Sequence, residues 1–207
     1  PTNIALLRDY LLEKKLSSVC IYESSRNKRI ADVSISTSFE EFSQLAFAGK
    51  TFRDEVEDGR AVIDYILSNF SHSFKKLILI GYSLGGVTAA VLGQEYEAYT
   101  VVTFGSATYF NIEKTNPILG DSLDKDAFKE YIHMATKDFD KKVICVRGTT
   151  DDTALQDDAF DLFKSFVAAS EKQYHEWQSI NHRFRAEDGS ISPDLIVKTT
   201  NLITTLF

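Results

Sequence analysis

Residues 77–93 read LILIGYSLGGVTAAVLG and combine an apolar strand, a tight turn and the start of a helix. The first four residues are apolar at every position, which is typical of a strand buried on both faces of a parallel sheet. Small residues follow the turn, and we expect a helix from Leu84 to about Tyr96. Between them, Gly81-Tyr82-Ser83-Leu84-Gly85 matches the pattern G-x-S-x-G. In that pattern a serine lies exposed on a sharp strand-to-helix turn, so the segment predicts a nucleophilic serine, Ser83.

The turn itself sets demands on the neighbours of Ser83. We expect Gly81 and Gly85 to lack side chains so that strand and helix can approach each other. Ser83 stands at the N-terminus of the helix, where free amides and the positive end of the helix dipole stabilise a developing oxyanion. The amide of Leu84 is the expected first donor. The alternative interpretation is a tight turn in which Ser83 merely caps the helix.

Strand and helix patterns alternate on both sides of this segment. Further apolar or β-rich runs predict strands at residues 18–22, 29–35, 100–104, 143–146 and 173–180. Helical spacing of apolar residues predicts helices at residues 4–16, 51–70, 124–135 and 157–169, and a last helix that begins at Ser192-Pro193-Asp194. The order predicts an α/β fold in which helices flank a mostly parallel sheet.

Composition narrows the class of protein. The chain has 207 residues and 23.3 kDa, which predicts one domain over residues 1–207. A net charge of −7 argues against nucleic-acid binding. Neither a membrane-spanning run nor a signal peptide is visible, and Cys20 and Cys145 fit two buried thiols better than a disulfide, so we expect a cytoplasmic protein. No cluster of metal-ligand spacing is present, so we expect neither a metal nor a cofactor. The oligomeric state stays open.

A nucleophilic serine needs a base. The strand-to-helix turn at residues 81–85 is the kind called a nucleophile elbow, and in proteins that carry such an elbow the order along the chain is serine, acid, histidine. Four histidines are present. His72 precedes the elbow, His133 falls in an expected helix, and His175 falls in an expected strand where packing is the simpler role. His182 follows that strand in a loop and is therefore the predicted general base.

The candidate acid follows another strand. Residues 143–146 are apolar and lead through Gly148 to the pair Asp151 and Asp152. Sites in parallel sheets lie beyond the carboxyl ends of the strands, and this places the acid there. We predict Asp151 as the orienting acid, with Asp152 as the alternative. The acidic clusters at residues 121–126 and 157–161 are interpreted as solvated helix starts and faces.

These motifs resemble those of a known family. GYSLGG at residues 81–86 and VTFGS at residues 102–106 are similar to the elbow and the following strand of class 3 (fungal-type) lipases, which belong to the α/β-hydrolases. The segment ISTSFEEFSQL at residues 35–45 faintly resembles their oxyanion segment, which implies a second oxyanion donor at Ser36 or Thr37. Tyr82 replaces the usual histidine, the sequence F-R-G is missing, and the chain is short for the class.

The resemblance implies an α/β-hydrolase-like three-layer sandwich with a reduced or absent lid, and residues 109–137 are a possible small cap. It implies a carboxylic-ester hydrolase, lipase or esterase, with Ser83, Asp151 and His182 as triad and Leu84 and Ser36 as oxyanion donors. The expected partner is a small-molecule or lipid ester, reached by transient contact with a membrane surface. Another serine hydrolase, such as a thioesterase or peptidase, or a catalytically silent binding module, remains the alternative.

Overall fold

A computed structural model of the chain describes residue 9 and residues 50–110, 125–186, 188–190 and 193–205. The elements in order are α3 (Phe52–Phe70), η2 (Ser71–Ser73), β1 (Ile78–Tyr82), α4 (Leu84–Glu95), β2 (Thr100–Phe104), α6 (Lys125–Thr136), β3 (Lys142–Gly148), α7 (Gln156–Ser165), β4 (Glu171–Trp177) and α8 (Pro193–Thr204). The helix expected at residues 4–16, the strands expected at 18–22 and 29–35, Cys20, Ser36 and Thr37 lie outside the described residues.

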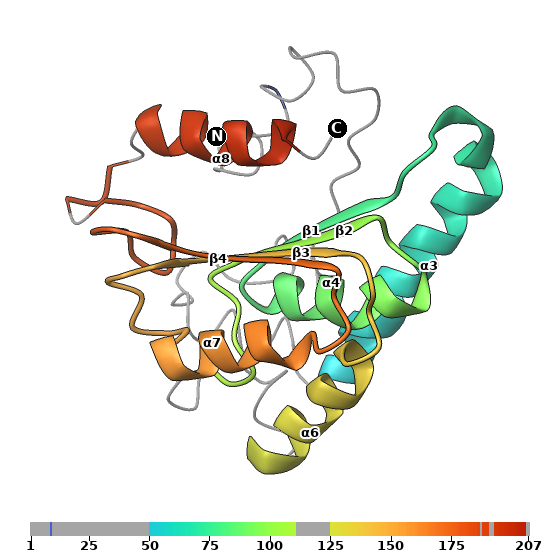
Figure 1. Ribbon diagram of the computed structural model, residues 1–207, viewed down its shortest axis with the longest axis horizontal. Helices are drawn as coiled ribbons and strands as arrows, with labels where there is room; N and C mark the ends of the chain where they lie inside the picture. Colours follow the sequence, from blue (N-terminus) through green and yellow to red (C-terminus); the bar gives the residue numbers. More distant parts are fainter. Residues whose placement is uncertain (1–8, 10–49, 111–124, 187, 191–192, 206–207) are drawn as a thin grey trace, which may run out of the picture.

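The described sheet has four strands in the order β1-β2-β3-β4, all parallel. Because the spatial order follows the chain order, crossovers of one hand place their connecting helices on one face of the sheet. Figure 1 shows α4, α6 and α7 on that face together with α3, while α8 covers the opposite face. The sheet between two helical layers confirms the predicted α/β fold.

Each face of the sheet has its own hydrophobic core, because side chains alternate along a strand. Val101 and Val143 pack toward α3, α4, α6 and α7 with residues such as Leu92. Val102 and Ile144 pack on the other face, toward Leu195 and Ile203 of α8. Both β2 and β3 are therefore buried almost throughout, as a parallel sheet covered on two sides requires.

The strand before the elbow departs from its prediction. Ile80 is 39% exposed, and the three residues before it, residues 77–79, are half-buried. The prediction that residues 77–80 are buried on both faces of the sheet was therefore wrong. Among the described strands, β1 has a hydrogen-bonded neighbour on one side, β2, and forms an end of the sheet. Apolar composition alone does not distinguish such a strand from a central one.

The helix expected at residues 157–169 is shorter than predicted, since α7 ends at Ser165. Phe166 leaves the helical conformation and lies fully buried, with its ring edge-to-face on Phe139 at a centroid distance of 5.8 Å. Because this ring packs in the core, the chain does not form the last turn of the predicted helix, residues 166–169. In contrast, α3 begins as expected, because Thr51 and Asp54 form a capping box at its N-terminus.

The acidic cluster at residues 157–161 is not simply solvated, which corrects the interpretation above. Asp158 is buried and Lys129 Nζ lies 2.5 Å from its Oδ1. Asp161 accepts a hydrogen bond of 2.8 Å from the Thr108 hydroxyl and lies 3.1 Å from His133 Nε2. The helix α6 packs beside α7 and brings these partners to the cluster. No helix in the described part of the chain is long and apolar enough to span a membrane.

Candidate active site

The carboxyl ends of the four strands carry the chemically interesting side chains. Ser83 directly follows β1, Gly105 and Ser106 follow β2, Asp151 follows β3, and His182 lies in the loop after β4. Parallel strands in register end at one edge of the sheet, so residues far apart in sequence meet there. The three predicted triad residues are brought together at this edge.

Ser83 has a strained backbone that its surroundings hold in place. Its φ of 53° and ψ of −125° lie in a region that residues other than glycine rarely adopt, at a cost of about 1–3 kcal/mol. The Ser83 amide donates to the Phe104 carbonyl at 2.8 Å, and the Ser106 hydroxyl donates to the Ser83 carbonyl at 2.8 Å. The amide and the carbonyl of Ser83 are therefore both anchored at the end of β2.

The glycines of the elbow do not all have the role that the motif suggests. A Cβ on Gly81 would lie 2.1 Å from the Gly85 carbonyl oxygen, so this position requires glycine. A Cβ on Gly85 would meet nothing within 4 Å, and the steric demand expected there was wrong. The tight position is Gly86, where a Cβ would lie 1.9 Å from Ser106 Oγ. The close approach falls one residue later because the helix turns Gly86, not Gly85, toward the neighbouring strand.

The Ser83 side chain points to the histidine loop, the segment of residues 178–186 that follows β4 and carries His182, rather than to its own helix. Ser83 Oγ lies 2.8 Å from His182 Nε2 and makes no capping bond to α4. This geometry disfavours the alternative in which Ser83 is only a capping residue. Leu84 is the first residue of α4, where an amide has no acceptor within its own helix. The predicted role of this amide as an oxyanion donor stays a prediction, and Ser36 lies outside the described residues.

Asp151 orients the imidazole from its other nitrogen. His182 Nδ1 lies 3.0 Å from both carboxylate oxygens of Asp151. Because a carboxylate accepts, Nδ1 carries the proton and Nε2 is left to accept from the Ser83 hydroxyl. The amides of Thr153 and Ala154 also donate to Asp151 Oδ1, at 3.0 and 2.8 Å. The Asp151 side chain is completely buried, while that of His182 is 18% exposed.

Asp152 does not share this environment. It is exposed, and its Oδ1 accepts a long hydrogen bond of 3.4 Å from the hydroxyl of Thr153. The contacts to the imidazole distinguish the two candidates and favour Asp151. The sequence alone left both open because adjacent residues in a turn differ only in where the backbone points them.

Arg147 holds the acid loop, the segment of residues 149–155 that carries Asp151 between β3 and α7. The sequence analysis missed this role. Arg147 is buried, and its guanidinium donates to the main-chain carbonyls of Asp151 and Ala154, each at 2.9 Å. Its third contact is to Glu176 Oε1 of β4 at 3.3 Å. The available signal was a charged residue directly after the apolar run of residues 143–146 and still within the strand, since a buried charge needs partners.

The side chain of Asn181 closes the histidine loop, and a main-chain hydrogen bond joins this loop to the acid loop. Asn181 Oδ1 accepts from the amides of Arg183 and Arg185 at 2.9 and 3.2 Å. The Thr150 amide donates to the Ile180 carbonyl at 3.1 Å. These bonds make the turn that carries His182 a compact unit beside Asp151.

The other three histidines lie in helices and strands. His133 pairs with Asp161 between α6 and α7, and His175 is half-buried in β4, where burial and the charge of Lys198 lower its pKa. His72 is exposed in η2. Within the described residues, no three His, Cys, Asp or Glu side chains are grouped in a way that would hold a metal ion.

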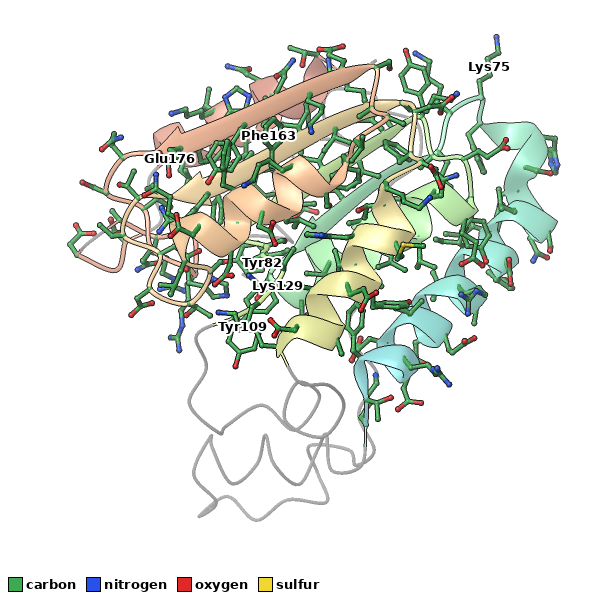
Figure 2. All side chains as sticks on the ribbon, turned by 60° about the horizontal axis from the view of Figure 1, so that its bottom comes forward. Lys75, Tyr82, Tyr109, Lys129, Phe163 and Glu176 are labelled. Atoms are coloured by element: carbon green, nitrogen blue, oxygen red, sulfur yellow. The ribbon has the colours of Figure 1, made fainter. Side chains whose placement is uncertain are left out.

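An aromatic residue after β2, Phe110, borders the site on one side. Phe110 is buried, and its ring stands edge-to-face to His182 at a centroid distance of 6.3 Å. Tyr109 beside it is partly exposed, and Figure 2 shows it where the described chain ends at residue 110. The remainder of the possible cap, residues 111–124, lies outside the described residues, and residues 125–136 form the core helix α6.

Known proteins resemble this chain in fold but not in sequence. No family model matches the chain, and no curated protein matches it in sequence. Among solved structures, the esterase domain of a Rhodothermus marinus protein is similar with a TM-score of 0.53 and 17% identity, over 72% of this chain and 66% of that domain, just under two thirds.

Two further solved structures align over a similar share. A monoacylglycerol lipase of Paleococcus ferrophilus has a TM-score of 0.55 and 15% identity, over 73% of this chain and 76% of that one. A structure of the metagenome-derived lipolytic enzymes LipS and LipT has a TM-score of 0.58 and 10% identity, over 78% and 75%. At such identities the likeness shows the fold, and this chain has a reduced α/β-hydrolase fold.

Proposed function

We propose that this chain is a serine hydrolase that cleaves carboxylic esters through an acyl-enzyme. The observation that carries the proposal is the continuous chain of contacts from Asp151 through His182 to Ser83, with distances of 3.0 and 2.8 Å. A buried carboxylate, an imidazole in one tautomer and a serine on a strained turn are the parts that nucleophilic acyl transfer needs. A catalytically silent binding module would gain nothing from the strained Ser83 backbone that this arrangement requires.

The chemistry follows from the contacts. Ser83 Oγ attacks the ester carbonyl carbon while its proton passes to His182 Nε2, and the amide of Leu84 donates to the oxyanion. The bond to the alcohol oxygen then breaks, and His182 gives the proton to the leaving alcohol. Water attacks the acyl-enzyme by the reverse proton path, releasing the carboxylic acid and restoring Ser83. Asp151 holds the tautomer and stabilises the imidazolium.

The ester class rests on two further supports. GYSLGG and VTFGS resemble class 3 lipases, and solved structures of similar fold include an esterase and a lipase. We propose Ser36 as the second oxyanion donor on the same resemblance, and a small-molecule or lipid ester as substrate. A thioesterase or a peptidase would use the same three residues, so the leaving group has to be determined by assay.

The test is labelling with a fluorophosphonate, in which an activated serine oxygen attacks phosphorus, fluoride leaves and the imidazole takes the proton. We expect one adduct on the peptide that contains Ser83 in the wild type, and none in Ser83→Ala, with activity lowered about a thousandfold or more. Ser68→Ala, an exposed serine of α3, is the matched control. A folded wild-type protein without an adduct contradicts the proposal.

A substrate panel then separates the ester from its alternatives. We expect turnover of p-nitrophenyl esters to exceed that of matched acyl-thioesters and peptide anilides with the same acyl group. A preference for the thioester or the anilide would keep the triad but overturn the ester assignment. Comparing acetate with palmitate esters in the same assay distinguishes an esterase from a lipase.

A further inference from the structure

Tyr82 connects the nucleophile turn to the histidine loop. It lies between Gly81 and Ser83, and its hydroxyl donates a hydrogen bond to the main-chain carbonyl of His182, which is 100 positions away. Tyr82 is half-buried at the carboxyl end of β1, and Figure 2 labels it near the centre of that view. The turn thus contacts His182 at its imidazole through Ser83 and at its main chain through Tyr82.

The ring of Tyr82 is fixed by an aromatic cluster. Its centroid lies 5.3 Å from that of Phe184 in an edge-to-face arrangement. Phe184 packs in the same manner on Phe104 at 5.4 Å and on Trp177 at 5.8 Å. Aromatic side chains have few torsions, so a ring held on this cluster presents its hydroxyl at a defined point.

The Tyr82 hydroxyl is suited to donate. Burial raises the pKa of Tyr82 well above its ordinary value, and the charge of Asp151 acts in the same direction. The phenol therefore keeps its proton at neutral pH, and the His182 carbonyl is an acceptor with no proton of its own. The direction of the bond is unambiguous.

The main chain of His182 determines where its imidazole lies. The amides of Arg183 and Arg185 bond to Asn181 Oδ1, so the turn moves as a unit. A displacement of its carbonyl would carry Nε2 away from Ser83 Oγ. Misplacement of a catalytic group by about 1 Å costs on the order of a hundredfold in rate.

We propose that the Tyr82 hydroxyl is a positioning group for His182, which holds the loop of the general base at the distance where Nε2 accepts the proton of Ser83. This inference rests on the proposed serine hydrolase function. It assigns a specific task to the residue that occupies the variable position before the nucleophile, where class 3 lipases usually have histidine.

The first test is Tyr82→Phe, which keeps the ring and removes the hydroxyl. We expect kcat for a p-nitrophenyl ester to fall about tenfold while KM stays within about twofold, because substrate binding does not use this bond. The matched control is Tyr96→Phe, whose hydroxyl also bonds a main-chain carbonyl, that of Arg60 at 3.3 Å, and a carboxylate, Asp64 at 2.6 Å. Its kcat should equal that of the wild type.

A double-mutant cycle separates positioning from a general structural role. In the His182→Ala background the base is absent, so Tyr82→Phe should leave the residual rate of fluorophosphonate labelling unchanged. An equal fall in both backgrounds would show that the hydroxyl acts on Ser83 or on overall stability, and would overturn the inference. Melting temperatures of all variants, measured alongside, should differ from their parents by no more than Tyr96→Phe does.

The failure of this inference is distinguishable from failure of the proposed function. If His182→Ala labels as fast as the wild type, the proposed mechanism is wrong. If His182→Ala is impaired and Tyr82→Phe is not, the mechanism stands and Tyr82 has no positioning role.

Discussion

Ser106 lies directly against Gly86, and its hydroxyl donates to the Ser83 carbonyl at 2.8 Å. A glycine at residue 86 thus makes room for the Ser106 hydroxyl that anchors Ser83. The segments VTFGS and GYSLGG therefore pack directly against each other, because Ser106 of the first fits only where the second has a glycine.

The first prediction compares the two glycines that follow the nucleophile. Gly86→Ala should lower the free energy of unfolding by about 1–3 kcal/mol, because its Cβ would overlap Ser106 Oγ and force the elbow to shift. Gly85→Ala should be neutral or stabilising by up to about 1 kcal/mol, since its Cβ meets nothing and alanine favours the helix. Urea unfolding of both variants measures the difference. Equal destabilisation by the two would contradict the packing described here.

The second prediction concerns the choice of acid. Asp151→Asn should lower kcat by about ten thousandfold, because an amide in place of the carboxylate no longer holds Nδ1 protonated. Asp152→Asn is the matched control, and kcat should change by less than about threefold because Asp152 is exposed. Steady-state kinetics on one ester suffices. A larger loss in Asp152→Asn than in Asp151→Asn would reverse the assignment.

The third prediction concerns Arg147. Arg147→Lys loses the forked donor that bonds the carbonyls of Asp151 and Ala154. We expect the free energy of unfolding to fall by about 1–3 kcal/mol and kcat to fall with it, since the acid loop loses its anchor. Arg60→Lys is the control, because Arg60 makes a comparable fork to Glu95 at a more exposed site. That change should cost less than about 1 kcal/mol. Similar losses in both variants would mean that burial of Arg147 contributes nothing.

The fourth prediction concerns acid stability at Asp161. Burial alone would raise the pKa of Asp161, but the Thr108 hydroxyl and the charges of His133 and Lys129 outweigh it, so the pKa is lowered. A carboxyl whose pKa is lowered by folding stabilises the folded state at every pH above its ordinary, unfolded-state pKa. This contribution is lost as the pH falls through the lower pKa of the folded state. The melting temperature of Asp161→Asn should therefore lie below that of the wild type near neutral pH, and the gap should close below about pH 4.

The control for this prediction is Asp138→Asn, which removes an exposed partner of Lys137. Its difference from the wild type should be small at every pH, since exposed ion pairs contribute about 0–1 kcal/mol. A gap for Asp161→Asn that persists undiminished at pH 3 would show that the carboxyl is not the group that titrates.

Within the described residues, local patterns were sufficient to predict the four strands, most of the helices and the strand-to-helix turn at Ser83. The ranges for α3, α4 and β2 match the expectations within a residue, because periodicity and glycine positions act over a few neighbouring residues. The chain order of serine, acid and histidine also follows from the strand order, since each loop leaves the same edge of a parallel sheet. His182 could be singled out before any coordinates because it lies in a loop after a strand.

The tertiary structure alone decided what depends on contacts between distant segments. Asp151 rather than Asp152 faces His182 across 31 positions, and Gly86 rather than Gly85 meets Ser106. The partial exposure of β1 and the contact of Tyr82 with His182 are of the same kind. Local sequence sets backbone torsions and which residues are apolar, but it does not state which neighbour a side chain meets. That is set by the packing of the strands and loops at the carboxyl edge of the sheet, where the site was assembled.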